Sequence, residues 1–193
     1  METEFEAKFY PVEKEKIRQK LKTIGANLVY SERKMKRVIF DYVTNPQLQC
    51  HYLRVRDEGN RITFSAKTHQ PEGGQLADQK EDVVSVDNFD KTVEIIKLSG
   101  LKQSHYQETL RETWELAGAE ITIDTWPWLE TYSEIEAASE EAVKTAADKL
   151  GFRWHEKIIT SVTEIFAKVY NLSLAEATKK IAHLTFESNP FLS

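Results

Sequence analysis

The sequence predicts an α+β protein in which helices interrupt an antiparallel β-sheet. Much of the chain alternates polar and apolar residues with the period of two that is typical of strands. Short turn-like segments, such as residues 57–60 and 117–119, join several of these strands, which favours antiparallel pairing. Other segments carry apolar residues at helical spacing. A chain of 193 residues is long enough to form one domain with a proper core.

The predicted strands begin at the N-terminus and are separated by turns, helices and one loop. They cover residues 4–9, 28–42, 50–67 as a hairpin, 80–86, 109–116, 119–126 and 131–137. The predicted helices cover residues 12–25, 87–100 and 139–151, each of which closes on a glycine, and a short segment that begins at Ser173. Asp87 and Ser139 are suited to capping helix N-termini, and Ser173 with Glu176 has the spacing of a capping box.

The amino-acid composition limits the kinds of binding partner and the cellular compartment that we expect for this protein. The net charge of −5 argues against nucleic acid as the main partner, because a phosphate-tracking surface needs a net basic field. The chain carries no long apolar run, so we expect no membrane association. A single cysteine, Cys50, cannot form an intrachain disulfide, which favours a reducing compartment and predicts a cytoplasmic protein.

The first predicted strand has one charged face and one apolar face. Glu4, Glu6 and Lys8 alternate with Phe5, Ala7 and Phe9, so the three charged side chains share one side of the strand. An ordinary surface strand with its polar side in water would also produce this pattern. The charge patterns of the other predicted strands help to distinguish a face exposed to solvent from a functional face.

The same alternation places like charges together on further strands. Arg54 and Arg56 share one face, and Glu134 and Glu136 share another. Like charges on one face repel unless something compensates them, so a closed sheet with these faces inward is too costly to bury without ligands and water. In a closed sheet the interior would hold these acidic and basic groups: Glu4, Glu6, Asp124, Glu134 and Glu136 against Lys8, Arg54, Arg56, Lys67, Arg111 and Lys80.

Basic and acidic groups that converge on one cavity suit a metal-phosphate site. Arg and Lys bind phosphate oxygens, and Arg often does so through two parallel hydrogen bonds. Clustered carboxylate oxygens suit the hard cations Mg²⁺ and Mn²⁺. The sequence contains neither a Walker A motif nor G-x-G-x-x-G, so side chains rather than a glycine-rich loop would hold the phosphates.

These motifs resemble, in order along the chain, those of the CYTH domain or triphosphate tunnel metalloenzyme family. Glu4-Phe-Glu6-Ala-Lys8 is similar to the family's ExExK motif, and the LRVR segment of residues 53–56 supplies the paired arginines. Ser65-Ala-Lys67 resembles its TxK motif, and Arg111-Glu-Thr-Trp114 its RxxW motif. The resemblance spans about residues 2–170. It implies a closed antiparallel eight-stranded β-barrel, or tunnel, with flanking helices over residues 1–172, followed by a helical appendage and tail at 173–193.

The resemblance also implies roles for the charged residues. The expected phosphate-binding residues are Lys8, Arg54, Arg56, Lys67, Arg111 and Lys80. The expected ligands of Mg²⁺ or Mn²⁺ are Glu4, Glu6, Glu81, Asp124, Glu134 and Glu136. The expected catalytic residues are Glu4, Glu6, Lys8 and Arg56. Lys80 and Glu81 lie where many members carry Arg-x-Glu, so this chain departs from that pattern at Lys80.

The motifs leave three functions open. The first is a metal-dependent triphosphatase that acts on inorganic triphosphate, thiamine triphosphate or a nucleotide. The second is a class IV adenylyl cyclase, which makes cyclic AMP and pyrophosphate from ATP, and the third is a non-catalytic binder of phosphorylated ligands. Trp126, Trp128 and Tyr132 could stack on an organic ring, although packing is the more common role of aromatic residues. The sequence is compatible with a monomer or a homodimer.

Overall fold

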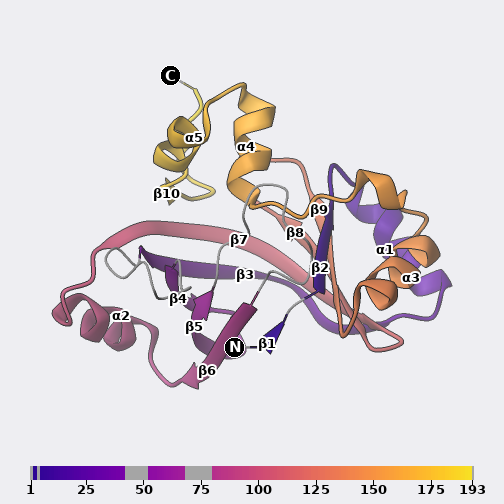
Figure 1. Cartoon of the computed structure of the whole chain (residues 1–193), viewed down its shortest axis with the longest axis horizontal. Coiled ribbons are helices and arrows are strands. Elements are labelled where there is room, and N and C mark those ends of the chain that lie inside the picture. The colour runs from indigo at the N-terminus through magenta and orange to yellow at the C-terminus, as the bar shows by residue number, and fades with distance from the viewer. Residues whose placement is uncertain (1, 4, 42–51, 68–79, 193) are drawn as a thin grey trace.

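The computed structural model describes residues 2–3, 5–41, 52–67 and 80–192. Within these ranges the strands form one sheet that curls strongly around its own axis, and helices pack around it (Figure 1). The eight longer strands are β2 (Phe5–Phe9), β3 (Asn27–Asp41), β4 (Tyr52–Asp57), β5 (Ile62–Lys67), β6 (Lys80–Val86), β7 (Gln103–Leu116), β8 (Ala119–Thr125) and β9 (Tyr132–Ala137). Two-residue strands β1 (Glu2–Thr3) and β10 (His183–Leu184) complete the sheet.

The strand order explains how the sheet curls back on itself. The order is β1-β6-β5-β4-β3-β7-β8-β9-β2, and each of these neighbours is antiparallel. Its two end strands, β1 and β2, are separated in sequence only by Glu4. The N-terminal segment therefore pairs with both edges of the sheet, with β6 through β1 and with β9 through β2. The predicted α+β fold with an eight-stranded antiparallel sheet is confirmed, but within the described residues the sheet is an open curl and not the closed barrel that was expected, because the strand order ends at β1 on one side and at β2 on the other.

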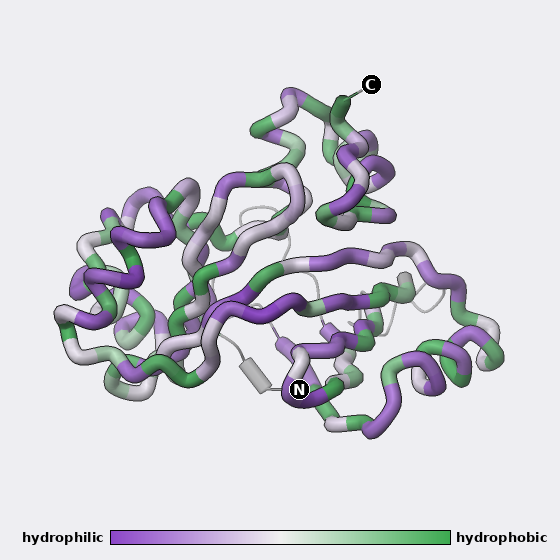
Figure 2. The backbone as a smooth tube through the Cα atoms, turned by 180° about the vertical axis from the view of Figure 1, so that it is seen from behind, coloured by the Kyte–Doolittle hydropathy of each residue, from purple (hydrophilic) through white to green (hydrophobic). Residues whose placement is uncertain are grey.

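Three apolar clusters attach the helices to the sheet. Helices α1 (Lys14–Thr23) and α3 (Glu140–Leu150) cover β2, β8 and β9 through a core that includes Leu21, Ile121 and Val143. Helix α2 (Phe89–Leu98) covers β3 and β4. Helices α4 (Val162–Tyr170) and α5 (Leu174–Lys180) form a third cluster with residues of β9 and the β8–β9 connection. Figure 2 shows that hydrophilic and hydrophobic stretches alternate along the helices, as amphipathic packing requires.

The helix boundaries confirm most of the predicted caps. Ser139 accepts a hydrogen bond from the backbone N–H of Ala142, and Gly151 ends α3 in the left-handed conformation, at φ 86°. Ser173 and Glu176 form the predicted capping box. The second helix is capped by Asn88, which accepts from Lys91 N–H, and not by Asp87. The cap is one residue later than predicted because both residue types are suited to the position.

Two elements differ from the sequence prediction. Strand β7 begins at Gln103, six residues before the predicted start at position 109, because its first half pairs with β3 up to Phe40. Helix α4 was not predicted, and its buried residues Ile165 and Phe166 pack on Trp126. Among the described residues, no helix combines the length and the apolar character needed to cross a membrane.

Candidate active site

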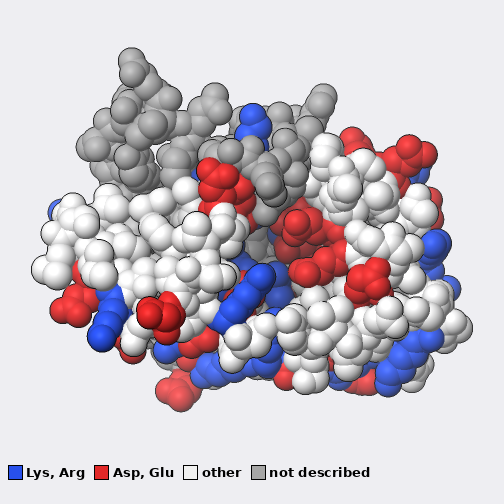
Figure 3. Space-filling view, turned by 90° about the horizontal axis from the view of Figure 1, so that it is seen from below, with Lys and Arg blue, Asp and Glu red and all other residues white. Residues whose placement is uncertain are grey.

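A cavity of about 420 Å³ lies inside the curl of the sheet. Strands β2 to β9 all contribute side chains to it, and so do α4 and α5. Figure 3 shows acidic and basic side chains gathered on either side of a hollow near the middle of one face. Most of the predicted site residues line this cavity: Glu6, Lys8, Arg54, Arg56, Lys67, Glu81, Arg111, Asp124, Glu134 and Glu136.

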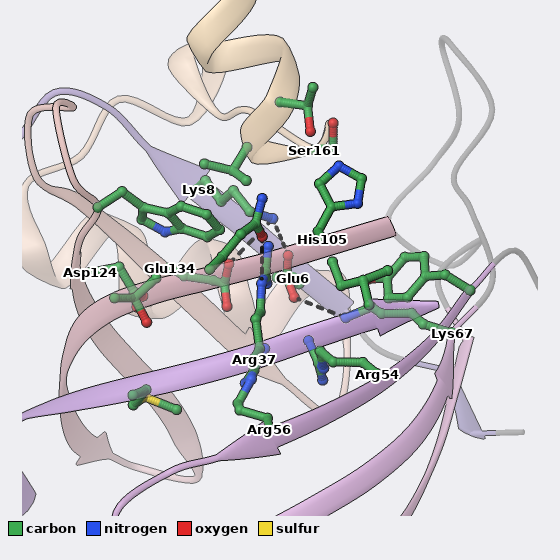
Figure 4. A pocket seen from close by; sticks show the side chains of 18 of the residues that line it. Glu6, Lys8, Arg37, Arg54, Arg56, Lys67, His105, Asp124, Glu134 and Ser161 are labelled. Atoms are coloured by element: carbon green, nitrogen blue, oxygen red, sulfur yellow. Dashed lines mark hydrogen bonds and ion pairs between the residues drawn. The ribbon is translucent and has the colours of Figure 1, made fainter. Parts of the chain in front are cut away.

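The strand period of β2 separates its charged residues from its apolar ones. Ala7 and Phe9 are buried in the core under α3, so Glu6 and Lys8 face the cavity. Pairing with β9 then sets Lys8 opposite Glu134. The Lys8 ammonium donates a hydrogen bond to Glu6 and lies 3.3 Å from a carboxylate oxygen of Glu134 (Figure 4). One ammonium group is thus shared by two buried carboxylates.

This shared contact shifts the pKa values of Lys8, Glu6 and Glu134. Burial opposes the charge of Lys8, but Glu6 and Glu134 outweigh it and raise the pKa of Lys8 above its usual range. Burial also opposes the charge of Glu6, and attraction from Lys8 and Lys67 lowers its pKa well below its usual value. Burial and repulsion from Glu6 raise the pKa of Glu134. The carboxylates of Glu6 and Glu134 therefore lie close enough to repel each other. Nearby positive charges stabilise the ionised form of Glu6 better than that of Glu134.

A second ion pair extends the acidic side along β7 and β8. The register places Arg111 opposite Asp124, and Nε of Arg111 donates to Oδ1 of Asp124 at 2.7 Å. The same guanidinium donates from Nη2 to Glu134 at 3.3 Å. Thr122 donates to the other oxygen of Asp124 at 2.5 Å. Asp124 is only 1% exposed, so these donors replace its lost hydration.

The basic side of the cavity carries more positive than negative charge. Arg37 of β3 lies opposite Arg56 of β4, and Arg54 is two residues further along the same face. In the part of the chain that the structure describes, the closest carboxylate to Arg56 is that of Glu58, at 3.8 Å from Nη1. Burial, together with repulsion from Arg54, Arg111 and Arg37, lowers the pKa of Arg56 to about 9. This part of the cavity favours the binding of an anion that supplies the missing negative charge.

Lys67 connects the basic and acidic sides. It lies opposite Glu81 in the β5–β6 pairing, with its ammonium 3.4 Å from Glu81 and 3.8 Å from Glu6. Glu81 also accepts a hydrogen bond from Nη2 of Arg54 at 2.6 Å. Burial opposes the charge of Lys67, but Glu6 is the main group that raises its pKa above the usual range. Lys67 therefore stays charged and lies close to both the acidic residues and the arginines of the cavity.

One predicted site residue, Lys80, does not line the cavity, and another, Glu4, lies outside the described residues. Lys80 directly precedes Glu81 in β6, and since successive side chains alternate, it points to the opposite face from Glu81. The prediction of Lys80 as a phosphate-binding residue overlooked this alternation. Glu4 lies outside the described residues, as does Cys50.

Other cavity residues were missed by the sequence analysis. Arg37 donates from Nε to Gln107 at 2.9 Å, and His105 lies further along β7 toward α4 and α5. The alternation in β3 contained a signal for Arg37, because Val38 and Phe40 on the other face are buried under α2. Gln107 and His105 lie in the half of β7 that was not predicted as strand.

The aromatic residues mainly pack rather than present open faces. Trp126 has the guanidinium of Arg37 over its ring at 4.5 Å, contacts Phe166 edge-on, and donates from its indole N–H to Tyr132. Trp128 donates to backbone carbonyls near the C-terminus and does not line the cavity. These contacts favour the packing interpretation of the DTWPW segment.

The carboxylates fit a divalent cation by chemistry but not by their present arrangement. Glu6, Asp124, Glu134 and Glu136 offer the oxygen donors that Mg²⁺ and Mn²⁺ prefer. The repulsion that raises the pKa of Glu134 is the kind that a divalent cation relieves. Within the described ranges, no three His, Cys, Asp or Glu side chains converge as a ready metal site. Binding of a cation would therefore exchange Lys8 and Arg111 contacts for metal contacts.

Solved structures of other proteins share this fold. A conserved hypothetical protein from Pyrococcus furiosus has 22% identity and a TM-score of 0.67, with 82% of this chain and 96% of that chain covered. A candidate adenylate cyclase from Vibrio parahaemolyticus has 13% identity and a TM-score of 0.70, with 86% and 98% covered. A candidate adenylyl cyclase from Hippeastrum, described as having a dominant triphosphatase activity, has 12% identity and a TM-score of 0.53, with 90% and 97% covered. At these identities the similarity establishes the fold alone.

Sequence comparison identifies the family. No curated protein matches the chain in sequence. The family model described as the CYTH domain matches residues 2–170, which include every cavity residue discussed above. The match covers most of the 193 residues. This chain therefore belongs to the CYTH domain family.

Proposed function

We propose that this protein is a divalent-metal-dependent triphosphatase that cleaves a phosphoanhydride bond of a triphosphate. The observation that carries the proposal is the charge distribution in one cavity. Arg37 and Arg56, which stand opposite each other and are largely buried, face Glu6 and Glu134, whose carboxylates repel each other. A triphosphate and a divalent cation supply the missing charge on each side.

The basic residues have the chemistry to bind and orient the phosphates. Arg54, Arg56 and Arg111 can each offer two parallel N–H groups to phosphate oxygens, while Lys67 and Lys8 act as single positive charges. Residues Lys8 and Arg56, which the family resemblance assigns to catalysis, lie on opposite sides of the cavity. A phosphate chain held between them would have its reacting phosphorus fixed in position, which is the main requirement of phosphoryl transfer.

Glu6, Asp124, Glu134 and Glu136 are the described residues that would hold Mg²⁺ or Mn²⁺, with Glu4 and Glu81 as further assigned ligands. When bound, the metal supplies Lewis-acid polarisation of phosphate oxygens. The low pKa of Glu6 keeps this carboxylate ionised at neutral pH, so it needs no deprotonation to act as a ligand. We also assign the protein to the cytoplasm, as its single cysteine suggests.

Adenylyl cyclase activity is the second candidate, and one observation favours it. The cavity continues past the charged residues to uncharged side chains from α4 and α5, which leaves room for a nucleoside. Both reactions use the same phosphate-binding residues, so they differ in products. Non-catalytic binding is the third possibility and predicts affinity without turnover.

Product analysis separates these candidates. Purified protein with Mg²⁺ or Mn²⁺ is incubated with ATP, thiamine triphosphate or tripolyphosphate in separate reactions. Orthophosphate release that is lost in Glu6→Gln and kept in Glu94→Gln, an exposed carboxylate of α2 that does not line the cavity, supports the triphosphatase. Cyclic AMP with pyrophosphate establishes the cyclase instead. Binding without any product contradicts both enzymatic proposals.

A further inference from the structure

Arg37 is a cavity cation that no motif in the sequence indicated, and the fold holds it in one orientation. Its Nε donates a hydrogen bond to the side-chain oxygen of Gln107 at 2.9 Å. The face of its guanidinium lies over the ring of Trp126, at 4.5 Å from the ring centroid. Trp126 is itself fixed, because it is only 3% exposed and its indole N–H donates to Tyr132. Two neutral side chains therefore orient the Arg37 guanidinium without pairing with its charge.

Gln107 is placed by strand pairing and by the C-terminal segment. It lies opposite Arg37 in the β3–β7 register and is only 1% exposed. Its side-chain amide donates to the backbone carbonyl of Ile181 at 2.8 Å. Ile181 follows the last residue of α5, where the final carbonyls of a helix have no partner within the helix. The N–H₂ end of the amide therefore satisfies this carbonyl, and its oxygen is turned toward Arg37.

A neutral amide is suited to this double contact. An ionised carboxylate at position 107 would neutralise Arg37 and could not donate to the carbonyl of Ile181. A cationic side chain would repel Arg37 and would offer it no acceptor. Gln107 instead holds both partners and leaves the positive charge of Arg37 available to a ligand.

The remaining edge of the guanidinium has no protein partner among the described residues. Within those ranges, neither Nη nitrogen of Arg37 makes a hydrogen bond or an ion pair. The side chain lines the cavity opposite Arg56 (Figure 4). Burial and repulsion from Arg54 lower the pKa of Arg37 to about 10, so the group stays charged at neutral pH. Two neighbouring Nη groups suit two oxygens of one phosphate.

We propose that Arg37 is a further phosphate-binding residue of the cavity and that Gln107, held by the carbonyl of Ile181, is its positioning residue. This inference rests on the proposed function of the charged cavity. Ile181 lies beyond residue 170, where the match to the family model ends, so the arrangement includes a part of this chain that the match does not cover. The C-terminal segment thus acts on the phosphate site through Gln107.

Binding of a triphosphate by variants of the full chain tests both roles. The probe is imidotriphosphate, in which nitrogen replaces the bridging oxygens and prevents hydrolysis. Calorimetric titration in the presence of Mg²⁺ gives Kd for the wild type, Arg37→Met, Gln107→Met and the double variant. Because no described carboxylate forms an ion pair with Arg37, its replacement leaves none of them uncompensated. Urea unfolding checks that each variant is folded.

Two control variants match the two substitutions. Arg153→Met removes an exposed positive charge, and Gln103→Met removes an exposed amide from the same strand as Gln107. Neither Arg153 nor Gln103 lines the cavity. Gln107→Asn is used if Gln107→Met does not fold, because it keeps an amide but is one methylene too short to reach both Ile181 and Arg37.

Arg37→Met should raise Kd about 10- to 100-fold, and Gln107→Met about 3- to 10-fold. In the Arg37→Met background, Gln107→Met should change Kd no further, because Gln107 acts through Arg37. A purely structural Gln107 would not show this dependence. Both control variants should keep the wild-type Kd.

The results that would overturn the inference differ from those that would overturn the proposed function. An unchanged Kd in Arg37→Met, or an equal effect of Gln107→Met with and without Arg37, overturns this inference while the triphosphatase proposal stands. If the wild type does not bind the probe with either Mg²⁺ or Mn²⁺, the proposed function fails, and this inference fails with it.

Discussion

The substitution Arg56→Gln is expected to strengthen the ligand-free fold and weaken triphosphate binding. Arg56 is largely buried near Arg54, Arg111 and Arg37, and among the described residues its nearest carboxylate, that of Glu58, lies 3.8 Å away. Glu58 has a closer partner in Arg61, at 2.7 Å, so it does not depend on Arg56. Removing the Arg56 charge therefore relieves repulsion without leaving a carboxylate uncompensated.

The pKa of Arg56 gives the size of the effect. It falls from its ordinary value of 12.5 to about 9, and a change of that size corresponds to roughly 4–5 kcal/mol against the charged form. Loss of the packing of the guanidinium offsets part of this, so we expect about 1–3 kcal/mol of added stability. For a chain of this length that is roughly 3–10 °C in Tm. Loss of a charge-assisted phosphate contact should raise Kd about 10- to 200-fold.

Urea unfolding and calorimetric titration with Mg²⁺ and tripolyphosphate measure the two effects separately. Arg18→Gln is the matched control, since Arg18 of α1 donates to Glu112 at 2.7 and 3.0 Å outside the cavity. The control should keep its affinity but lose about 2–4 kcal/mol of stability, because Glu112 is only 4% exposed and loses its charged partner. A less stable Arg56→Gln protein with wild-type affinity would refute the reasoning that Arg56 is held for an anion.

Three further predictions concern the acidic side, a buried core residue and a helix end. Glu6→Gln should lower the unfolding free energy by about 3 kcal/mol at pH 7, because Lys8 loses its closest partner. Since folding lowers the pKa of Glu6, the stabilisation by its carboxylate is present above about pH 4.5 and is lost as the pH falls. In urea titrations the unfolding free energies of the wild type and the variant should therefore converge at acidic pH. Phe166→Ala should cost about 3–5 kcal/mol in urea unfolding, and a cost below about 1 kcal/mol would show that α4 is not packed as described. Gly151→Ala should lower the unfolding free energy by about 1 kcal/mol because of its φ of 86°, whereas an unchanged Tm would contradict the left-handed helix end.

The charged faces of the strands could be predicted from the sequence because they depend on local geometry alone. Side chains two positions apart share a face in any strand, so the pairs Arg54/Arg56 and Glu134/Glu136 are evident without a structure. Helix ends are equally local. The Ser173 capping box requires only a hydroxyl and a carboxylate three residues apart.

Tertiary structure decided which of these faces meet. The alternation in β3 does not say that Arg37 stands opposite Arg56, because that placement depends on the register in which β3 pairs with β4. Likewise, no local pattern places Leu174 and Thr178 beside a cavity whose strand residues lie between Glu6 and Glu136, far earlier in the chain. The sequence by itself thus determined the two-faced strands and the chemistry of the charged set. Strand pairing and the curl of the folded sheet are what bring the acidic and basic side chains together in one cavity.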